Sequence, residues 1–384
     1  AQHINRDSYY GGGQDPNAYG NTTDLNWMAG SQYVYSFGKC IFMPADLTAG
    51  IEFNQDKLED NMWGYHRTVD QKVNIGSAFL QNEWKNDHWG FLIGGRLDKH
   101  NLIDHVIFSP RANLRYNPTE NINLRFSYSS GFRAPQAFDE DLHVENVGGN
   151  VAMVELADNL KEERSQSLSA SADIYHRFGA FQVNFLVEGF YTKLSDVFAL
   201  TDGEIVDGIL TRTRYNAPGA RVMGLTLEGK MAYLTKFQLQ AGITLQQSHY
   251  SEPHVWNKEA PAVKKMMRTP NTYGYFTATY TPIKPLSIAL SGTYTGSMLV
   301  PHEPVPGFLE KPITVNTKDF FDIGLKAAYD FKLYKSMNLQ VNAGVQNIFN
   351  AYQNDFDKGA DRDSGYIYGP SLPRSFFAGV KISY

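Results

Sequence analysis

The feature that most constrains this chain is an alternation of apolar and polar side chains with a period of two residues. The segment 236–246 shows it clearly. One phase reads Phe237, Leu239, Ala241, Ile243 and Leu245, and the other reads Gln238, Gln240, Gly242, Thr244 and Gln246. The same pattern returns in 121–129, 285–294 and 338–346. Successive side chains of a β-strand point to opposite faces, so this period predicts strands with one apolar and one polar face. A helical period is almost absent, and we predict an all-β fold.

The connections between the predicted strands alternate between short and long. Short turns are predicted at 85–88, 117–121, 177–180, 233–236, 281–285 and 332–336, and long polar loops at 132–163, 199–218, 250–270, 299–318 and 351–372. Short turns at one end and long loops at the other are typical of an antiparallel outer-membrane β-barrel. The polar phase is rich in Gln, Asn and Ser, which favours a crowded wet interior over the open surface of a soluble sandwich. We count about sixteen transmembrane strands over residues 1–384, which form one domain.

The last residues, "PRSFFAGVKISY", read as a strand that runs to the end of the chain. Its apolar phase holds Phe376, Ala378, Val380, Ile382 and Tyr384, and its polar phase is broken only by Phe377. Parity places this end on the side of the short, periplasmic turns, so Tyr384 falls in an interfacial aromatic girdle. We expect this strand to lie beside the first strand of the barrel.

The first residues, "AQHINRDSYY", behave differently because neither phase is apolar. Such a segment cannot cross hydrocarbon, so it is predicted to be the rim of a strand that rises into a loop. We therefore expect the membrane-crossing part of that strand to precede Ala1, and the chain to be part of a longer protein.

Composition and motifs exclude several classes of function. The single cysteine, Cys40, leaves no internal disulfide and no multi-cysteine zinc site. A net charge of −5 and the absence of a basic block give no reason to expect nucleic acid. No catalytic triad, paired catalytic carboxylates, P-loop or dinucleotide fingerprint appears, so we predict neither an enzyme nor a bound cofactor.

Short motifs then follow one another along the chain: "GGRLDKH" (94–100), "SPRANLRYNP" (109–118), "YSSGFRAPQAFDEDLH" (128–143), "NLKEERSQSLSASAD" (159–173), "YNAPGARVMGLTLEG" (215–229), "GVQNIFNAYQ" (344–353) and the terminal "FFAGVKISY". Over nearly its whole length the sequence resembles the C-terminal barrel part of TonB-dependent outer-membrane receptors, most closely those of Bacteroidetes type. Glu162 departs from the pattern, because proline is common there.

The resemblance implies a 22-stranded barrel with an internal plug domain, of which this chain holds about sixteen strands and no plug. It implies the outer membrane of a Gram-negative bacterium, and import of a scarce nutrient such as a ferric siderophore, haem or cobalamin. The implied partners are outer-membrane lipid, the TonB complex through the missing N-terminal region, the nutrient (an iron chelate is favoured) and a possible surface lipoprotein. The barrel-assembly machinery would recognise Phe376, Val380, Ile382 and Tyr384.

Two other functions stay open at this stage. The first is a self-contained, porin-like passive channel of about sixteen strands, which the chain length favours and the polar first strand disfavours. The second is a surface-binding barrel that transports nothing.

Candidate ligand contacts are sought in the long loops, because loops on a rigid scaffold carry function. The candidates are Arg133, Asp139, Glu140, Asp141 and His143 at one loop mouth, His249 and His254 in a second loop, and Tyr9, Tyr10 and Tyr19 near the start of the chain. Each set has a plainer interpretation: a strand-to-loop corner, scattered histidines and aromatic packing, respectively. The corner and the scattered histidines are the favoured interpretations.

A fourth loop places Asp355, Asp357, Asp361 and Asp363 close together. Carboxylates of this kind could bind Ca²⁺, but Gly359 and Ala360 break the spacing of a calcium-binding loop. A solvated acidic loop is the favoured interpretation, and no metal site is predicted.

Overall fold

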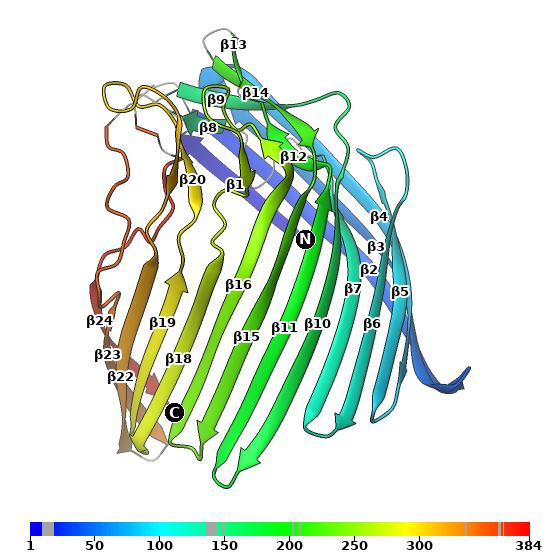
Figure 1. The fold of residues 1–384 in the computed structure, drawn as a ribbon, viewed down its shortest axis with the longest axis vertical. Coiled ribbons are helices and arrows are strands. Elements are labelled where there is room, and N and C mark those ends of the chain that lie inside the picture. The colour runs from blue at the N-terminus through cyan, green and yellow to red at the C-terminus, as the bar shows by residue number, and fades with distance from the viewer. Residues whose placement is uncertain are drawn as a thin grey trace.

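A computed structural model describes residues 1–9, 19–135, 144–147, 150–201, 203–206, 209–334, 336–359, 362–363 and 365–384. Its long strands form one antiparallel meander that curves into a barrel wall (Figure 1). In chain order these are β1 (Gln2–Tyr9), β2 (Tyr19–Cys40), β3 (Met43–Met62), β4 (Arg67–Lys85), β5 (Trp89–His100), β6 (Ile107–Thr119), β7 (Ile122–Arg133), β10 (Glu163–Phe178), β11 (Phe181–Ser195), β15 (Ala220–Tyr233), β16 (Phe237–His254), β18 (Thr272–Ile283), β19 (Leu286–Thr295), β22 (Phe320–Tyr334), β23 (Met337–Gln346) and β24 (Ser375–Ser383). Each pairs with the next, which confirms the predicted all-β barrel strands.

The strand register puts the two predicted phases on two faces of the wall. Ile243 lies opposite Leu227, and Leu245 lies opposite Leu225, so the apolar side chains of β15 and β16 share one face. These four side chains belong to the exposed or half-exposed outward surface. On the other face, the hydroxyls of Thr226 and Thr244 are hydrogen-bonded at 3.0 Å. The outward face is therefore apolar and the inward face polar, as lipid outside and water inside require.

The predicted short turns are confirmed, and the long loops lie at the opposite end, although β16 runs past the predicted loop start at residue 250, to His254. The predicted short turns lie at one end of the wall, for example where β10 meets β11, β15 meets β16 and β18 meets β19 (Figure 1). A further tight hairpin joins β2 to β3 at Cys40–Met43. At the other end the connections carry the 3₁₀ turn Trp63–Tyr65 and short strands: β8 (Val144–Val147), β9 (Asn150–Leu156), β12 (Val197–Leu200), β13 (Glu204–Val206), β14 (Ile209–Ala217), β17 (Val263–Lys265), β20 (Leu299–His302) and β21 (Ile313–Asn316).

The two edges of the meander are β1 and β24. Among the described residues, β24 pairs with β23, where Val380 lies opposite Val341 and Ile382 lies opposite Leu339. It does not pair with β1, and the expected contact with the first strand of the complete barrel stays a prediction. β1 pairs with Tyr19–Asn26, the loop-end part of β2, which agrees with its prediction as a polar rim.

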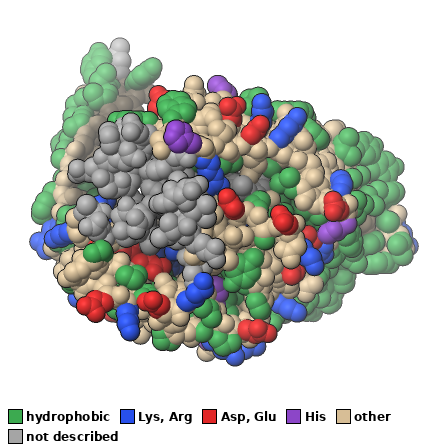
Figure 2. Space-filling view, turned by 90° about the horizontal axis from the view of Figure 1, so that it is seen from above, with side chains coloured by type: hydrophobic (Ala, Val, Ile, Leu, Met, Phe, Trp, Pro, Cys, Tyr) green, Lys and Arg blue, Asp and Glu red, His purple; other side chains and the backbone are tan. Residues whose placement is uncertain are grey.

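Side-chain chemistry differs between the wall and the loop end. Seen from above, the flank of the molecule is largely apolar, whereas the loop end carries mixed acidic and basic side chains (Figure 2). No helix in the described part of the chain is long and apolar enough to cross a membrane.

Phe377, the exception in the last strand, covers a glycine. It lies on the inward face opposite Gly344 of β23. A Cβ added at Gly344 would collide with the Phe377 ring and with the carbonyl oxygen of Leu325. An aromatic ring over a glycine of the neighbouring strand shields backbone that a side chain would otherwise cover. The aromatic residue in the polar phase is thus explained by packing.

We expect Gly344→Val to destabilise the last hairpin, because overpacking costs ~1–3 kcal/mol. Gly229→Val is the control, since a Cβ there meets nothing within 4 Å. The fraction of folded barrel, measured by heat-modifiable gel mobility, should fall for Gly344→Val and stay unchanged for Gly229→Val. Equal fractions would contradict the packing role of Phe377.

The face assignment is tested by a charge placed on either side of β16. Ile243→Arg puts a cation near the middle of the outward apolar face, which costs ~2–4 kcal/mol in a barrel. Gln240→Arg puts the same group on the inward, wet face. We expect much less assembled Ile243→Arg protein in the outer membrane; equal yields would overturn the assignment.

Candidate ligand-binding end of the barrel

One part of the loop end is a small sheet built from two separate connections, the one between β7 and β10 and the one between β11 and β15. β14 pairs in parallel with β9 and antiparallel with β12 and β13, and β8 pairs with β9. The Arg67 guanidinium of the wall donates to the carbonyl oxygen of Val154 at 2.6 Å. We call β8, β9, β12, β13 and β14 the loop sheet. Its pairing ties two long loops into one rigid layer.

Two arginines, one from the loop sheet and one from the wall, pack on the same aromatic ring of β12. Arg214 of β14 is 1% exposed, and its guanidinium lies 5.9 Å from the centre of the Phe198 ring. Arg133, at the end of β7, lies over the same ring at 5.4 Å. The Phe198 amide donates to a carboxylate oxygen of Glu163 at 3.0 Å. The candidate Arg133 thus lies at a packed strand-to-loop corner, as the plainer interpretation expects.

A carboxylate also holds the entry to β10. Arg164 donates to Glu162 at 2.6 Å, and the ring nitrogen of His105 lies 3.0 Å from the same oxygen. Burial by itself would raise the pKa of Glu162, but the hydrogen bonds from Arg164 and the backbone outweigh it and lower the pKa. Glu162 therefore stays charged. At this position, where proline is common in the family, the chain has a carboxylate that forms an ion pair with Arg164.

The last connection, residues 347–374, packs against the β20–β21 hairpin. Met298, Val300 and Tyr366 form a buried core, flanked by Val315 and Tyr368. Gln353 secures the same loop, because its amide donates to the Tyr366 carbonyl at 2.9 Å and accepts from the Tyr368 amide at 2.8 Å. We call residues 298–302, 313–316, 351–359, 362–363 and 365–369 the loop cluster.

The acidic residues of this loop are structural. His302 stacks on Tyr366 at 3.8 Å between ring centres, and its Nε2 lies 2.9 Å from Asp357. Asp363 is 4% exposed and accepts from the backbone amides of Glu303 and Gly365 at 2.9 and 2.8 Å. The interpretation as a solvated acidic loop is therefore wrong for Asp357 and Asp363. Their carboxylates satisfy buried donors.

Asp355 belongs to the same cluster but is more exposed. It accepts from the Tyr368 hydroxyl at 2.6 Å. Burial, and then this hydrogen bond, raise the pKa of Tyr368 far above its ordinary value, so the hydroxyl remains a donor. Asp361 lies outside the residues that the structure describes.

The two histidines of the second candidate loop lie in a strand. β16 continues to His254, so the prediction of a loop from residue 250 is wrong there. The His254 ring packs on Tyr250 at 4.8 Å, while His249 lies between Arg221 and Lys265 in the register. Over the described residues, no three His, Cys, Asp or Glu side chains gather where they could hold a metal ion.

The tyrosines near the start of the chain are brought together. Tyr9 lies opposite Tyr19 in the β1–β2 ladder, with ring centres 5.1 Å apart and planes inclined at 57°. The two residues are 48% and 55% exposed. They form an accessible aromatic pair. The other candidates, Tyr10, Asp139, Glu140, Asp141 and His143, lie outside the described residues.

Below the loops, a polar network covers the inward face. The Tyr275 hydroxyl donates to Glu228 and accepts from Gln240 at 2.8 Å, and Lys230 pairs with Glu228 at 2.7 Å. The alternation in β16 predicts Gln240 on the inward face, but the network joins side chains of three strands, β15, β16 and β18, and no pattern within one strand indicates it. The barrel interior is thus polar and internally bonded.

The comparisons with known proteins agree with this geometry. Residues 1–348 match the family model described as TonB dependent receptor-like, beta-barrel. The chain belongs to the TonB-dependent receptor family. Receptors of this family are outer-membrane proteins of Gram-negative bacteria. The Bacteroidetes type stays a prediction, and no curated protein matches the sequence.

Solved structures that share this fold include three siderophore receptors. A ferric enterobactin receptor of Pseudomonas aeruginosa superposes with a TM-score of 0.70 at 18% identity, over 99% of this chain and 58% of that one. The ferric-catecholate import receptor Fiu of E. coli K12 gives 0.68 at 14%, over 98% and 59%. The siderophore receptor PirA of Acinetobacter baumannii gives 0.65 at 16%, over 94% and 55%. This chain therefore spans little more than half the length of these proteins, which are receptors rather than enzymes.

We expect Asp363→Ala to loosen the loop cluster, because the backbone amides of Glu303 and Gly365 lose their acceptor at a cost of ~1–3 kcal/mol. Limited proteolysis should cut residues 347–374 several-fold faster in this variant than in the parent protein. Asp363→Asn, which keeps an acceptor oxygen, should be intermediate, and Asn354→Ala, an exposed change in the same loop, should have no effect. An unchanged cleavage rate for Asp363→Ala would contradict the structural role of this carboxylate.

Proposed function

We propose that this chain is the barrel wall of an outer-membrane receptor that imports a scarce nutrient, and that this nutrient is a ferric siderophore. The observation that carries the proposal is the family match, together with neighbours that are named as ferric enterobactin, siderophore and ferric-catecholate receptors. Fold likeness alone does not name a ligand. The ferric siderophore is therefore our inference, and haem or cobalamin is the alternative ligand.

We infer that the wall is completed by strands outside this chain. An open edge cannot face hydrocarbon, because every backbone donor and acceptor there must find a partner. β1 and β24 are such edges among the described strands. A 22-stranded barrel with a plug would satisfy them, and the plug would provide the contact with the TonB complex. The same unpaired edges disfavour a self-contained channel of sixteen strands.

Ligand binding is assigned to the loop end. The loop sheet and the loop cluster give a rigid rim, and Tyr9 and Tyr19 offer exposed rings to an aromatic ligand such as a catecholate. Offset or tilted aromatic pairs contribute ~0.5–1.5 kcal/mol each beyond their buried area. Arg133 and the residues 139–143 are the second candidate contact.

Uptake of iron-55 supplied as ferric enterobactin tests the function. Cells that carry the full-length receptor should accumulate the probe only when TonB is present, and a protonophore should abolish the uptake. Accumulation that is independent of TonB and proportional to probe concentration would support the passive channel. Absence of accumulation with every ferric chelate tried would overturn the iron assignment.

A double variant Tyr9→Ala/Tyr19→Ala tests the aromatic contact. Loss of two stacking interactions should weaken ferric enterobactin binding about tenfold, which corresponds to ~1.4 kcal/mol. Tyr33→Ala is the matched control, because Tyr33 is an exposed tyrosine on the outward face of the same β2 strand. Quenching of intrinsic fluorescence on the purified full-length receptor provides the affinity, and equal affinities would exclude the tyrosine pair from the site.

A further inference from the structure

Four basic side chains form a row across neighbouring strands at the loop end of the wall. In the register Lys193 lies opposite Arg221, Arg221 opposite His249, and His249 opposite Lys265. Directly opposed residues of antiparallel strands project from the same face, with their Cβ atoms about 5 Å apart. Residues of β11, β15, β16 and β17 thus bring their cationic groups into one line. We call these four residues the basic row.

The basic row projects outward, toward lipid. Lys193 and Arg221 share the strand phase of Tyr191 and Met223, which lie two residues nearer the membrane centre. His249 shares the phase of Leu245, which lies four residues nearer the membrane centre on β16. Since the phase of a strand alternates strictly, the row belongs to the apolar, outward face.

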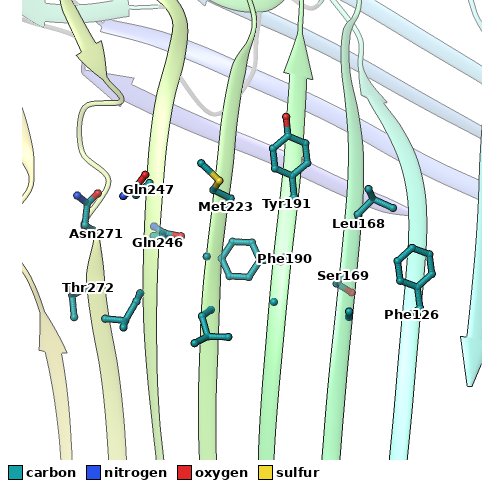
Figure 3. A pocket seen from close by; sticks show the side chains of 15 residues that line it. Phe126, Leu168, Ser169, Phe190, Tyr191, Met223, Gln246, Gln247, Asn271 and Thr272 are labelled. Atoms are coloured by element: carbon teal, nitrogen blue, oxygen red, sulfur yellow. The ribbon is translucent and has the colours of Figure 1, made fainter. Parts of the chain in front are cut away.

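Directly below the basic row, the outward face is hollowed. A shallow groove of about 910 Å³ crosses β10, β11, β15 and β16. Its walls include Leu168, Tyr191, Met223 and Leu245, as Figure 3 shows for the first three of these, which come from three adjacent strands. Its floor includes Gly189, where an added Cβ would meet nothing within 4 Å. The groove exists because small residues lie between larger apolar ones.

The height of the basic row matches the lipid headgroups. Phe181, Tyr233, Phe237 and Tyr280 lie opposite one another at the short-turn end and mark the periplasmic aromatic girdle. His249 is twelve residues beyond Phe237 on β16. At about 3.4 Å per residue and a tilt of ~40°, this separation is ~30 Å along the membrane normal. The outward apolar band of such barrels is ~25 Å tall, so the basic row lies just outside it.

The charges of the basic row are not neutralised by the protein. In the described part of the chain, no carboxylate pairs with Lys193, Arg221 or Lys265. The acidic residues in the regular parts of these strands, Glu188 and Glu228, are on the inward phase. Glu252 follows His249 on β16 but lies beyond the irregularity that interrupts the register.

We propose that the basic row and the groove together bind an anionic lipid of the outer leaflet. Its phosphate groups are held by Lys193, Arg221 and Lys265, with His249 adding charge when protonated, and one of its acyl chains lies in the groove. Basic side chains at the headgroup level attract phosphate, and a preformed apolar groove matches the chain attached to it. The basic row lies directly above the groove on the same part of the wall. A lipid, which carries both a phosphate and an acyl chain, is therefore favoured over a soluble anion.

The test uses the purified full-length receptor in detergent and native mass spectrometry. Diphosphoryl lipid A is the probe, and diacylglycerol, which has acyl chains but no phosphate, is the comparison lipid. The parent protein should retain lipid A at concentrations at which diacylglycerol is lost. Inorganic phosphate at equal concentration should not displace it, because the acyl chain contributes to binding. Displacement by inorganic phosphate would show a site for a free anion and would overturn the lipid assignment.

Two variants separate the parts of the site. Lys193→Gln/Arg221→Gln should reduce lipid A retention at least tenfold, and Gly189→Leu, which adds a side chain to the floor of the groove where a Cβ meets nothing within 4 Å, should reduce it several-fold. Lys57→Gln/Lys72→Gln is the matched control: it removes the same charge from an outward pair on β3 and β4 that adjoins Glu59 and Asp70. Folding is checked by heat-modifiable mobility. Equal retention by all three variants, or loss in the control alone, would overturn the proposal.

Discussion

The structure depends on one constraint: within hydrocarbon, every backbone amide and carbonyl must be paired inside the sheet. The antiparallel meander meets this condition along each ladder from β1 to β24. Once pairing is fixed, side chains can only alternate between two environments, and each strand has to be apolar on one phase and polar on the other. The short turns follow as well, because neighbouring antiparallel strands need only a tight connection at the periplasmic end. The choice of side chain is less constrained at the loop end and on the inward face.

This constraint explains what could be predicted. The wall was predictable because the alternation of Leu239, Ala241, Ile243 and Leu245 is a local signal that the membrane enforces. Phe377 violated the alternation, and its reason was not local, since it covers Gly344 of another strand. The strands and their faces were therefore predictable from local alternation, whereas side-chain contacts between neighbouring strands were not.

The loop end shows the limits of prediction more strongly. Asp357 and Asp363 look like a solvated acidic run, yet their environment is supplied by His302 and Glu303, about sixty residues away. In the loop sheet β9 pairs with β14 in parallel, and no short-range sequence pattern predicts this pairing. The basic row is invisible in the sequence for the same reason: Lys193, Arg221, His249 and Lys265 are aligned only by the register of four strands. Sites assembled from distant segments depend on the fold, whereas strand faces depend on the solvent around each segment.

The central claim is that the odd phase of β16 faces lipid from the periplasmic girdle to the basic row. Site-directed spin labelling in a Cys40→Ser background tests it directly, because Cys40 is the single cysteine of the chain. Labels placed one at a time from 237 to 249 would be probed with oxygen, which partitions into lipid, and with a water-soluble nickel complex. The account predicts high oxygen access at 239, 241, 243 and 245, low access at the residues between them, and a change to nickel access at 249. A scan without a two-residue period, or with the phases reversed, would contradict it.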